Sequence, residues 1–129
     1  MPRKKTAAAR LNQSHSRFPR RPPEIDAFVD RFLFTVCDTS RRYILELLAE
    51  PNEKDASNPY ERRSGDIAED LGLSNATTSE HLRHLAALHL VSTRKEGTAV
   101  YYRLSNHTLV QAFQDLLHAL DNHYQEQSS

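Results

Sequence analysis

The stretch GDIAEDLGLSNATTSEHLRHLAALHLV, residues 65–91, contains two short helical patterns that meet at a single glycine. Gly72 ends the first pattern, because a glycine readily adopts the left-handed conformation that terminates a helix. Ser74 follows at once and can cap the second helix with its hydroxyl group. The positions predicted to face the core are Ile67, Ala68, Leu71, Thr78, Leu82 and Leu85. Two helices joined by so tight a turn predict a helix-turn-helix.

Further elements are predicted on both sides of this unit. Apolar residues recur at helical spacing over 25–36, over 41–50 with Ile44, Leu47 and Leu48 buried, and over 108–122. Asp38, Thr39 or Ser40 can cap the second of these helices, and the polar residues 51–63 indicate a loop. VSTRK and TAVYYRL, on either side of a Glu96-Gly97 turn, predict a β-hairpin. The expected fold is mainly α with a small β-hairpin.

The front of the second helix carries short hydroxyl and amide side chains. In a helix-turn-helix the second helix presents its N-terminal residues to base edges in the major groove. Short polar side chains let the helix enter deeply, and a basic hairpin can reach the backbone as a wing. The predicted DNA-binding residues are Asn75, Ala76, Thr77, Ser79, His81, Arg83, Arg94 and Lys95. A merely polar helix start is the alternative interpretation, and Glu80 argues for it.

Charge is distributed unevenly along a chain whose formal net charge is zero. Residues 1–23 hold seven of the 17 basic side chains and none of the 17 acidic ones. The remaining residues therefore hold 10 basic and 17 acidic side chains, a net charge of −7. We expect residues 1–23 to form a disordered basic arm that contacts phosphates, residues 24–122 to form the folded domain, and residues 123–129 to be a polar tail.

Composition excludes several other classes of protein. Cys37 is the only cysteine of the 129 residues, which rules out an intramolecular disulfide and favours a cytoplasmic location. A lone cysteine after an apolar helix is interpreted as a buried packing residue rather than a redox sensor. No apolar run reaches the length of a membrane span. Gly-rich phosphate loops, HExxH and nucleophile elbows are missing, so we expect no enzyme.

Three stretches together resemble the winged helix-turn-helix repressors of the ArsR/SmtB family: SRRYILELLAE, the long stretch from Gly65 to Leu104, and the final helix. The resemblance spans about residues 25–122 in element order. It implies a homodimer that binds a palindromic DNA operator and is released by an inducer, often a metal ion. ERRSGDI lacks the cysteines with which many members bind metal at the short helix. A winged helix used only for protein interactions is the alternative function.

Dimerisation is expected because a small core cannot cover both strongly apolar outer helices. The resemblance implies the same, since the family builds its dimer from the first and last helices. The predicted interface residues are Phe28, Phe32, Phe113 and Leu117.

Two histidines on the final helix suggest a metal site between protomers. His107 and His118 lie eleven residues apart, within about 20° of one helix face but about 16 Å apart along the axis. Antiparallel pairing with a second copy would bring His107 near the other chain's His118, with Asp121 as a third ligand. This spacing resembles the interhelical zinc site of the family, although Ser105 stands where the family has an aspartate. Zn(II) or a similar divalent ion is thus a candidate inducer, and two ordinary polar histidines are the alternative.

Overall fold

The computed structural model describes residues 17–128, which belong to two compact units, Met1–Cys37 and Asp38–Ser129. Most of the predicted basic arm, residues 1–16, lies outside the described residues. Residues 17–22 are exposed and form no helix or strand. Helix α2, Pro23–Val36, then begins at a proline, whose fixed φ suits the first turn of a helix.

Cys37 lies directly after α2 and is exposed. The interpretation of this cysteine as a buried packing residue was therefore wrong. The physical reason is the end of the helix: Val36 is the last helical residue of the apolar stripe, and Cys37 leaves the helical geometry that kept that stripe on one face.

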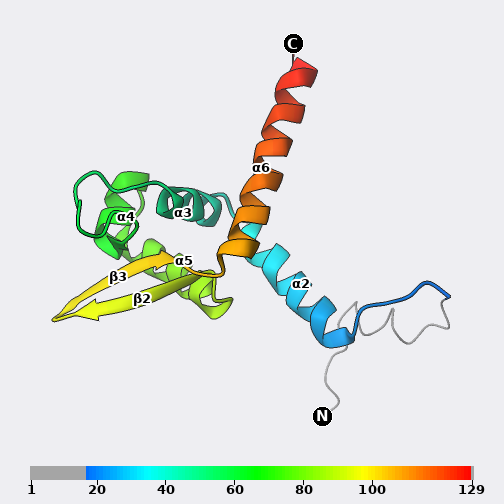
Figure 1. The fold of residues 1–129 in the computed structure, drawn as a ribbon, viewed down its shortest axis with the longest axis horizontal. Helices are drawn as coiled ribbons and strands as arrows, with labels where there is room; N and C mark the ends of the chain where they lie inside the picture. Colours follow the sequence, from blue (N-terminus) through cyan, green and yellow to red (C-terminus); the bar gives the residue numbers. More distant parts are fainter. Residues whose placement is uncertain (1–16, 129) are drawn as a thin grey trace. The chain divides into compact units, whose positions relative to one another are not determined.

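The second unit contains the predicted helix-turn-helix and hairpin (Figure 1). Its helices are α3, Thr39–Ala49; α4, Ser64–Leu71; α5, Asn75–Ala87; and α6, His107–Ser128. Its strands are β1, Arg62–Arg63; β2, Val91–Glu96; and β3, Ala99–Leu104. They form one antiparallel sheet in the order β1-β3-β2. The structure thus confirms a mainly α fold with a small hairpin after the second helix of the motif.

The turn between α4 and α5 has the predicted left-handed glycine, with a φ of 68° at Gly72. Gly72 donates its N–H to the carbonyl of Glu69 at 3.2 Å, and Leu73 donates to the carbonyl of Ala68 at 2.9 Å. These two bonds occupy carbonyl groups that the end of a helix leaves unpaired. Ser74 then caps α5 by accepting from the N–H of Thr77 at 3.1 Å.

The core joins α3, α4 and α5 to the base of the hairpin. Thr78, Leu82 and Leu85 are fully buried, as the helical spacing predicted. On α3, Leu45 is buried while Leu47 is only half-buried, so the predicted stripe of Ile44, Leu47 and Leu48 is corrected at one position. Helix α3 contacts α4, α5 and β3, and side chains at two adjacent positions are needed to reach these neighbours.

Strand β1 lies in a segment that was predicted to be a loop. Arg62 is only 5% exposed, and its Nη1 donates to the carbonyls of Leu47 at 2.7 Å and Glu50 at 2.9 Å. A buried arginine therefore completes the C-terminal end of α3, and burial lowers its pKa. Two charged residues in succession gave no apolar signal for a strand, which is why the sequence did not indicate β1.

Two element boundaries differ from their predicted positions. The hairpin turns at Gly97 and Thr98 rather than at Glu96 and Gly97, because Glu96 pairs with Ala99 in the register. Gly97, with a φ of 61°, occupies the first central position, where a two-residue turn needs a positive φ. Helix α6 continues through residues 123–128, which were predicted to be a polar tail. These residues include neither Gly nor Pro, so nothing in them ends the helix.

Among residues 17–128, no helix combines the length and the apolar character needed to cross a membrane.

The left-handed turn generates a stability prediction. Gly72→Ala should lower the free energy of unfolding by about 1–2 kcal/mol, because a Cβ at positive φ is strained even where space is open. Gly65→Ala is the matched control: Gly65 lies inside α4 with equally open space, so alanine should stabilise the protein by up to about 1 kcal/mol. Urea unfolding at one fixed protein concentration measures both changes. Equal stability of the two variants would contradict the role of the turn.

Candidate nucleic-acid interface

Most of the predicted DNA-binding residues lie on the exposed front of α5. Asn75, Ala76, Thr77, Ser79 and Arg83 are all exposed. Ser74 and Thr77 are joined by a hydrogen bond of 2.8 Å between their hydroxyl oxygens, which fixes the Thr77 side chain at the helix start. The front of α5 therefore presents short polar side chains on a capped, well-anchored first turn.

Glu80 lies on the same front, and basic neighbours compensate its charge. It forms an ion pair with Arg83, and its Oε1 lies 3.2 Å from Nε2 of His84. The hydrogen bond from Arg83 is the main cause of the lowered pKa of Glu80. Because the carboxylate is paired within its own helix, its repulsion of DNA phosphates is reduced.

His81 is more buried than the predicted DNA-binding residues at the front of α5. Its side chain is only 12% exposed, and its Nδ1 accepts a hydrogen bond of 3.1 Å from Nε of Arg41 on α3. Its Nε2 lies 4.0 Å from Oδ1 of Asp38, the residue that caps α3. A hydrogen bond from the backbone N–H of Arg41 is the main cause of the lowered pKa of Asp38. His81 thus joins α5 to the start of α3 and does not stand among the exposed residues.

Arg94, predicted to contact DNA from the wing, is bound within the sheet. Its Nε donates to Glu61 at 2.9 Å and its Nη1 donates to Glu96 at 2.7 Å. The guanidinium carbon lies 4.7 Å from the ring centroid of Tyr101 on β3. The two carboxylates raise the pKa of Arg94. This arginine therefore clamps β2 to β3 and to the residue before β1.

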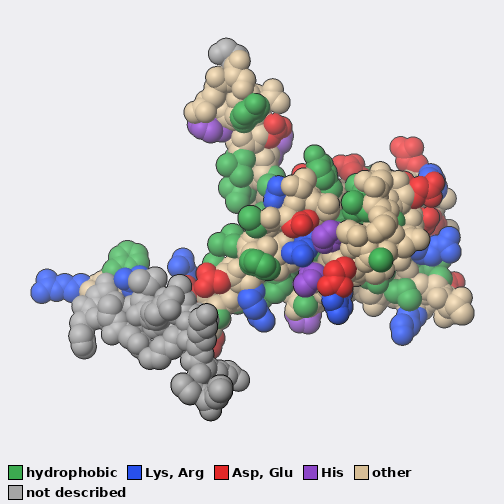
Figure 2. All heavy atoms as spheres, turned by 180° about the vertical axis from the view of Figure 1, so that it is seen from behind, with side chains coloured by type: hydrophobic (Ala, Val, Ile, Leu, Met, Phe, Trp, Pro, Cys, Tyr) green, Lys and Arg blue, Asp and Glu red, His purple; other side chains and the backbone are tan. Residues whose placement is uncertain are grey.

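Lys95 and Arg103 are exposed on the same hairpin. Arg103 donates to the hydroxyl of Ser92 at 3.3 Å, which orients it along the sheet. The sequence prediction did not include Arg103 or Arg41. The alternation of TAVYYRL could have indicated Arg103 as an outward residue, whereas no sequence pattern pointed to the contact of Arg41 with His81. Basic, acidic and histidine side chains are intermixed on the face in Figure 2.

The residues predicted for dimerisation differ in their exposure. Phe28 and Phe32 of α2 and Leu117 of α6 are half-buried. Phe113 is only 8% exposed, so this ring belongs to the interior of the chain. The apolar stripe of α6 continues beyond it with exposed residues: Leu116 at 50%, Leu120 at 55% and Tyr124 at 70%. Exposed apolar residues on α2 are Ile25, Val29, Leu33 and Phe34.

The residues predicted to bind a metal ion lie at two places along α6. His107 is its first residue, whereas His118 and Asp121 line a groove that also includes Glu46 of α3 and Glu50, the residue after α3. Within residues 17–128, no three His, Cys, Asp or Glu side chains of one chain are grouped so that they could hold a metal ion. A site built from these three residues would therefore require a second copy of the chain.

Sequence comparison connects this arrangement with known proteins. Residues 38–93 match the family model of the bacterial regulatory proteins of the arsR family. The transcriptional activator HlyU of Vibrio cholerae is 45% identical over 56 residues, which are 43% of this chain and 51% of that protein. The matched segment thus spans about half the length of this curated relative.

Solved structures extend the likeness to most of the chain. The winged helix-turn-helix DNA-binding domain of Mb0332 from Mycobacterium bovis, described as homodimeric, aligns with a TM-score of 0.66 at 28% identity. That alignment covers 84% of this chain and 92% of the other. HlyU from Vibrio cholerae aligns with a TM-score of 0.59 at 33% identity, over 75% of this chain and 95% of the other. These are regulators and not enzymes. The chain belongs to the ArsR family of winged helix-turn-helix regulatory proteins.

Proposed function

We propose that this protein is a homodimeric transcriptional repressor that binds a palindromic operator and is released by an inducer. It would work in the cytoplasm, where bacterial DNA lies. The observation that carries the proposal is the exposed polar front of α5 beside a hairpin with outward cations. No catalytic step is needed, because binding and release of DNA are sufficient to regulate transcription.

The front of α5 supplies the chemistry for direct readout. Asn75 can form paired hydrogen bonds with adenine, Ser79 can donate or accept, and the methyl of Ala76 can contact a thymine methyl. Lys95 and Arg103 on the wing supply charge for the phosphate backbone, which positions the protein without reading sequence. Asn75, Ala76 and Ser79 are therefore the proposed base readers.

His81 and Arg94 have a different role in this proposal. The bond between Arg41 and His81 joins the start of α3 to the middle of α5. The contacts of Arg94 with Glu61 and Glu96 hold the wing in its sheet. Both residues therefore orient the surfaces that touch DNA, so their loss should weaken binding to every sequence rather than change base preference.

Dimerisation is supported by the exposed stripe on α6. Figure 2 shows hydrophobic side chains along this projecting helix. Leu116, Leu120 and Tyr124 recur every four residues, a spacing that keeps them on one helix face. The homodimeric domain from Mycobacterium bovis is consistent with a second copy as the partner of this face.

A divalent metal ion such as Zn(II) is one candidate inducer. Its site would combine His107 of one protomer with His118 and Asp121 of the other, because residues 17–128 of a single chain do not group three such ligands. Imidazole nitrogens and a carboxylate are suitable ligands for Zn(II).

Binding to upstream DNA tests the function against its alternative, a protein-interaction module. Fluorescence anisotropy should show saturable binding to DNA upstream of the protein's own coding region, tighter than to a scrambled duplex by about 10³-fold or more. Equal, weak affinity for both duplexes would instead support the interaction module.

Loss of one base reader should relax sequence preference. Ser79→Ala should reduce the free-energy difference between operator and scrambled DNA by about 1–3 kcal/mol, because a hydroxyl group that contacts a base edge is lost. Ser57→Ala, the same change in an exposed loop far from α5 in sequence, should leave the difference unaltered. The assignment of Ser79 fails if both variants discriminate as well as the wild type.

A charge in the exposed stripe of α6 should separate the protomers. Leu116→Asp should shift the protein from dimer to monomer in sedimentation velocity and abolish operator binding, because a buried unpaired carboxylate is costly. Asn122→Asp adds the same charge on the opposite face of the helix and should leave a dimer. A Leu116→Asp dimer that binds operator normally would place the interface elsewhere.

Cobalt tests the metal site. Co(II) should bind at about two ions per dimer with ligand-field absorption, and it should weaken operator binding by about 1–3 kcal/mol. His118→Ala and Asp121→Ala should remove both effects, whereas Asp115→Ala, elsewhere on α6, should remove neither. Absence of ligand-field bands in the wild-type dimer would exclude a metal ion as inducer at these residues.

A further inference from the structure

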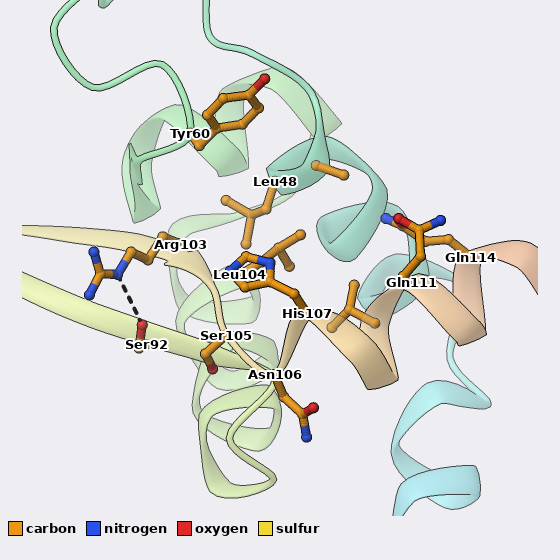
Figure 3. A pocket seen from close by; sticks show the side chains of 12 residues that line it. Leu48, Tyr60, Ser92, Arg103, Leu104, Ser105, Asn106, His107, Gln111 and Gln114 are labelled. Carbon is orange, nitrogen blue, oxygen red and sulfur yellow. Dashed lines mark hydrogen bonds between the residues drawn. The ribbon is translucent and has the colours of Figure 1, made fainter.

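A cavity of about 720 Å³ lies at the base of the wing, within the unit Asp38–Ser129 (Figure 3). The end of α3 contributes Leu48, the loop contributes Tyr60, the strands contribute Ser92 and Arg103, and the first turns of α6 complete the wall. In Figure 3 His107 points from the start of α6 toward Leu48. A volume of this size suits a small organic molecule.

The lining of this cavity has an unusual charge for this protein. Residues 24–129 carry a net charge of −7, yet none of the twelve lining residues is Asp or Glu. Arg103 supplies a permanent positive charge, and His107 supplies imidazole nitrogens. An anion would therefore meet a donor-rich wall without facing a carboxylate there.

The remaining lining residues define the rest of a ligand. Leu48, Leu104 and Val110 offer an apolar surface, and Tyr60, with 55% of its surface exposed, adds an aromatic ring. Uncharged hydrogen-bonding groups surround this surface: those of Ser92, Ser105, Asn106, Gln111 and Gln114. Such a combination of one charged contact and an apolar wall is typical of sites for small molecules with an apolar body and one polar group.

Ser105 in the wall of the cavity is hydrogen-bonded to the residues that follow α5. Ser105 donates its hydroxyl hydrogen to the carbonyl of His89 at 2.5 Å and its N–H to the carbonyl of Leu90 at 2.9 Å. His89, which follows α5, is held at a φ of 58°. A ligand that contacts Ser105 and Arg103 would therefore act on both the end of α5 and the base of the wing.

We propose that this cavity binds a small carboxylic acid with an aromatic or otherwise apolar body, and that its occupation changes operator affinity. Arg103 would pair with the carboxylate, and the apolar wall between Leu48 and Val110 would cover the body of the ligand. The proposed effect on DNA rests on the function proposed above, whereas the binding site itself does not.

Benzoate and its neutral analogue benzamide test the site in the full-length protein without DNA. At constant ionic strength, benzoate should shift the amide NMR signals of residues 103–111 saturably at millimolar concentration. Benzamide should bind about tenfold more weakly, because it lacks the charge-assisted contact.

Variants test whether the NMR shifts arise from benzoate bound in the cavity. Arg103→Gln should weaken benzoate binding about tenfold, and Gln111→Trp should block it by filling space. Lys54→Gln removes an exposed cation from the loop before β1, outside the lining, and should leave benzoate binding unchanged. Absence of saturation below about 20 mM, or undiminished shifts in Arg103→Gln, would overturn the site.

An operator titration then tests the consequence for DNA binding. Saturating benzoate should change operator affinity of the wild type by about fivefold or more, and operator DNA should change benzoate affinity by the same factor. Benzoate binding with unchanged operator affinity would overturn the inducer role. A protein that binds benzoate but no operator would instead refute the proposed function while the site stands.

Discussion

The left-handed backbone at Gly72 fixes the direction of α5 relative to α4. The position of the exposed front of α5, which is proposed to contact DNA, depends on this direction. Two hydrogen bonds close the end of α4 around the glycine, and the Ser74 cap starts α5 two residues later. With α4 and α5 fixed in this way, Thr78, Leu82 and Leu85 face the core and Ser79 faces outward. A longer or more flexible turn would loosen the relation between the buried and exposed faces of the helix.

Polar residues near this surface divide into those that hold elements together and those that are exposed for contact. Arg62, Arg94 and the pair of Arg41 with His81 belong to the first group, since each forms hydrogen bonds between different elements. Each of these contacts involves a charged side chain, and burial or hydrogen bonding holds that side chain in one geometry. The second group is small and consists of short side chains on α5 and of cations on the wing. A rigid frame of this kind limits the entropy lost when the exposed groups bind DNA.

The sequence predicted those parts of the fold that rest on local rules. The left-handed glycine, the Ser74 cap and the buried face of α5 followed from spacing and residue type. The short strand β1 and the buried Arg62 did not, because their partners lie 12 to 15 residues away and no local pattern records a contact to a backbone carbonyl. The candidate site divides in the same way. Ser79 lies on the exposed face by helical period, whereas Arg41 and Arg94 owe their roles to partners across the chain.

In the proposed complex, the front of α5 lies against DNA bases. Photo-crosslinking tests this contact directly: a benzophenone amino acid is placed at Ser79 in one protein and at the exposed Asp115 of α6 in another. Both proteins are irradiated with labelled operator. We expect a strong protein–DNA cross-link from position 79 that maps to bases within the operator half-site, and none from position 115. A silent position 79 beside an efficient cross-link from α6 would contradict it.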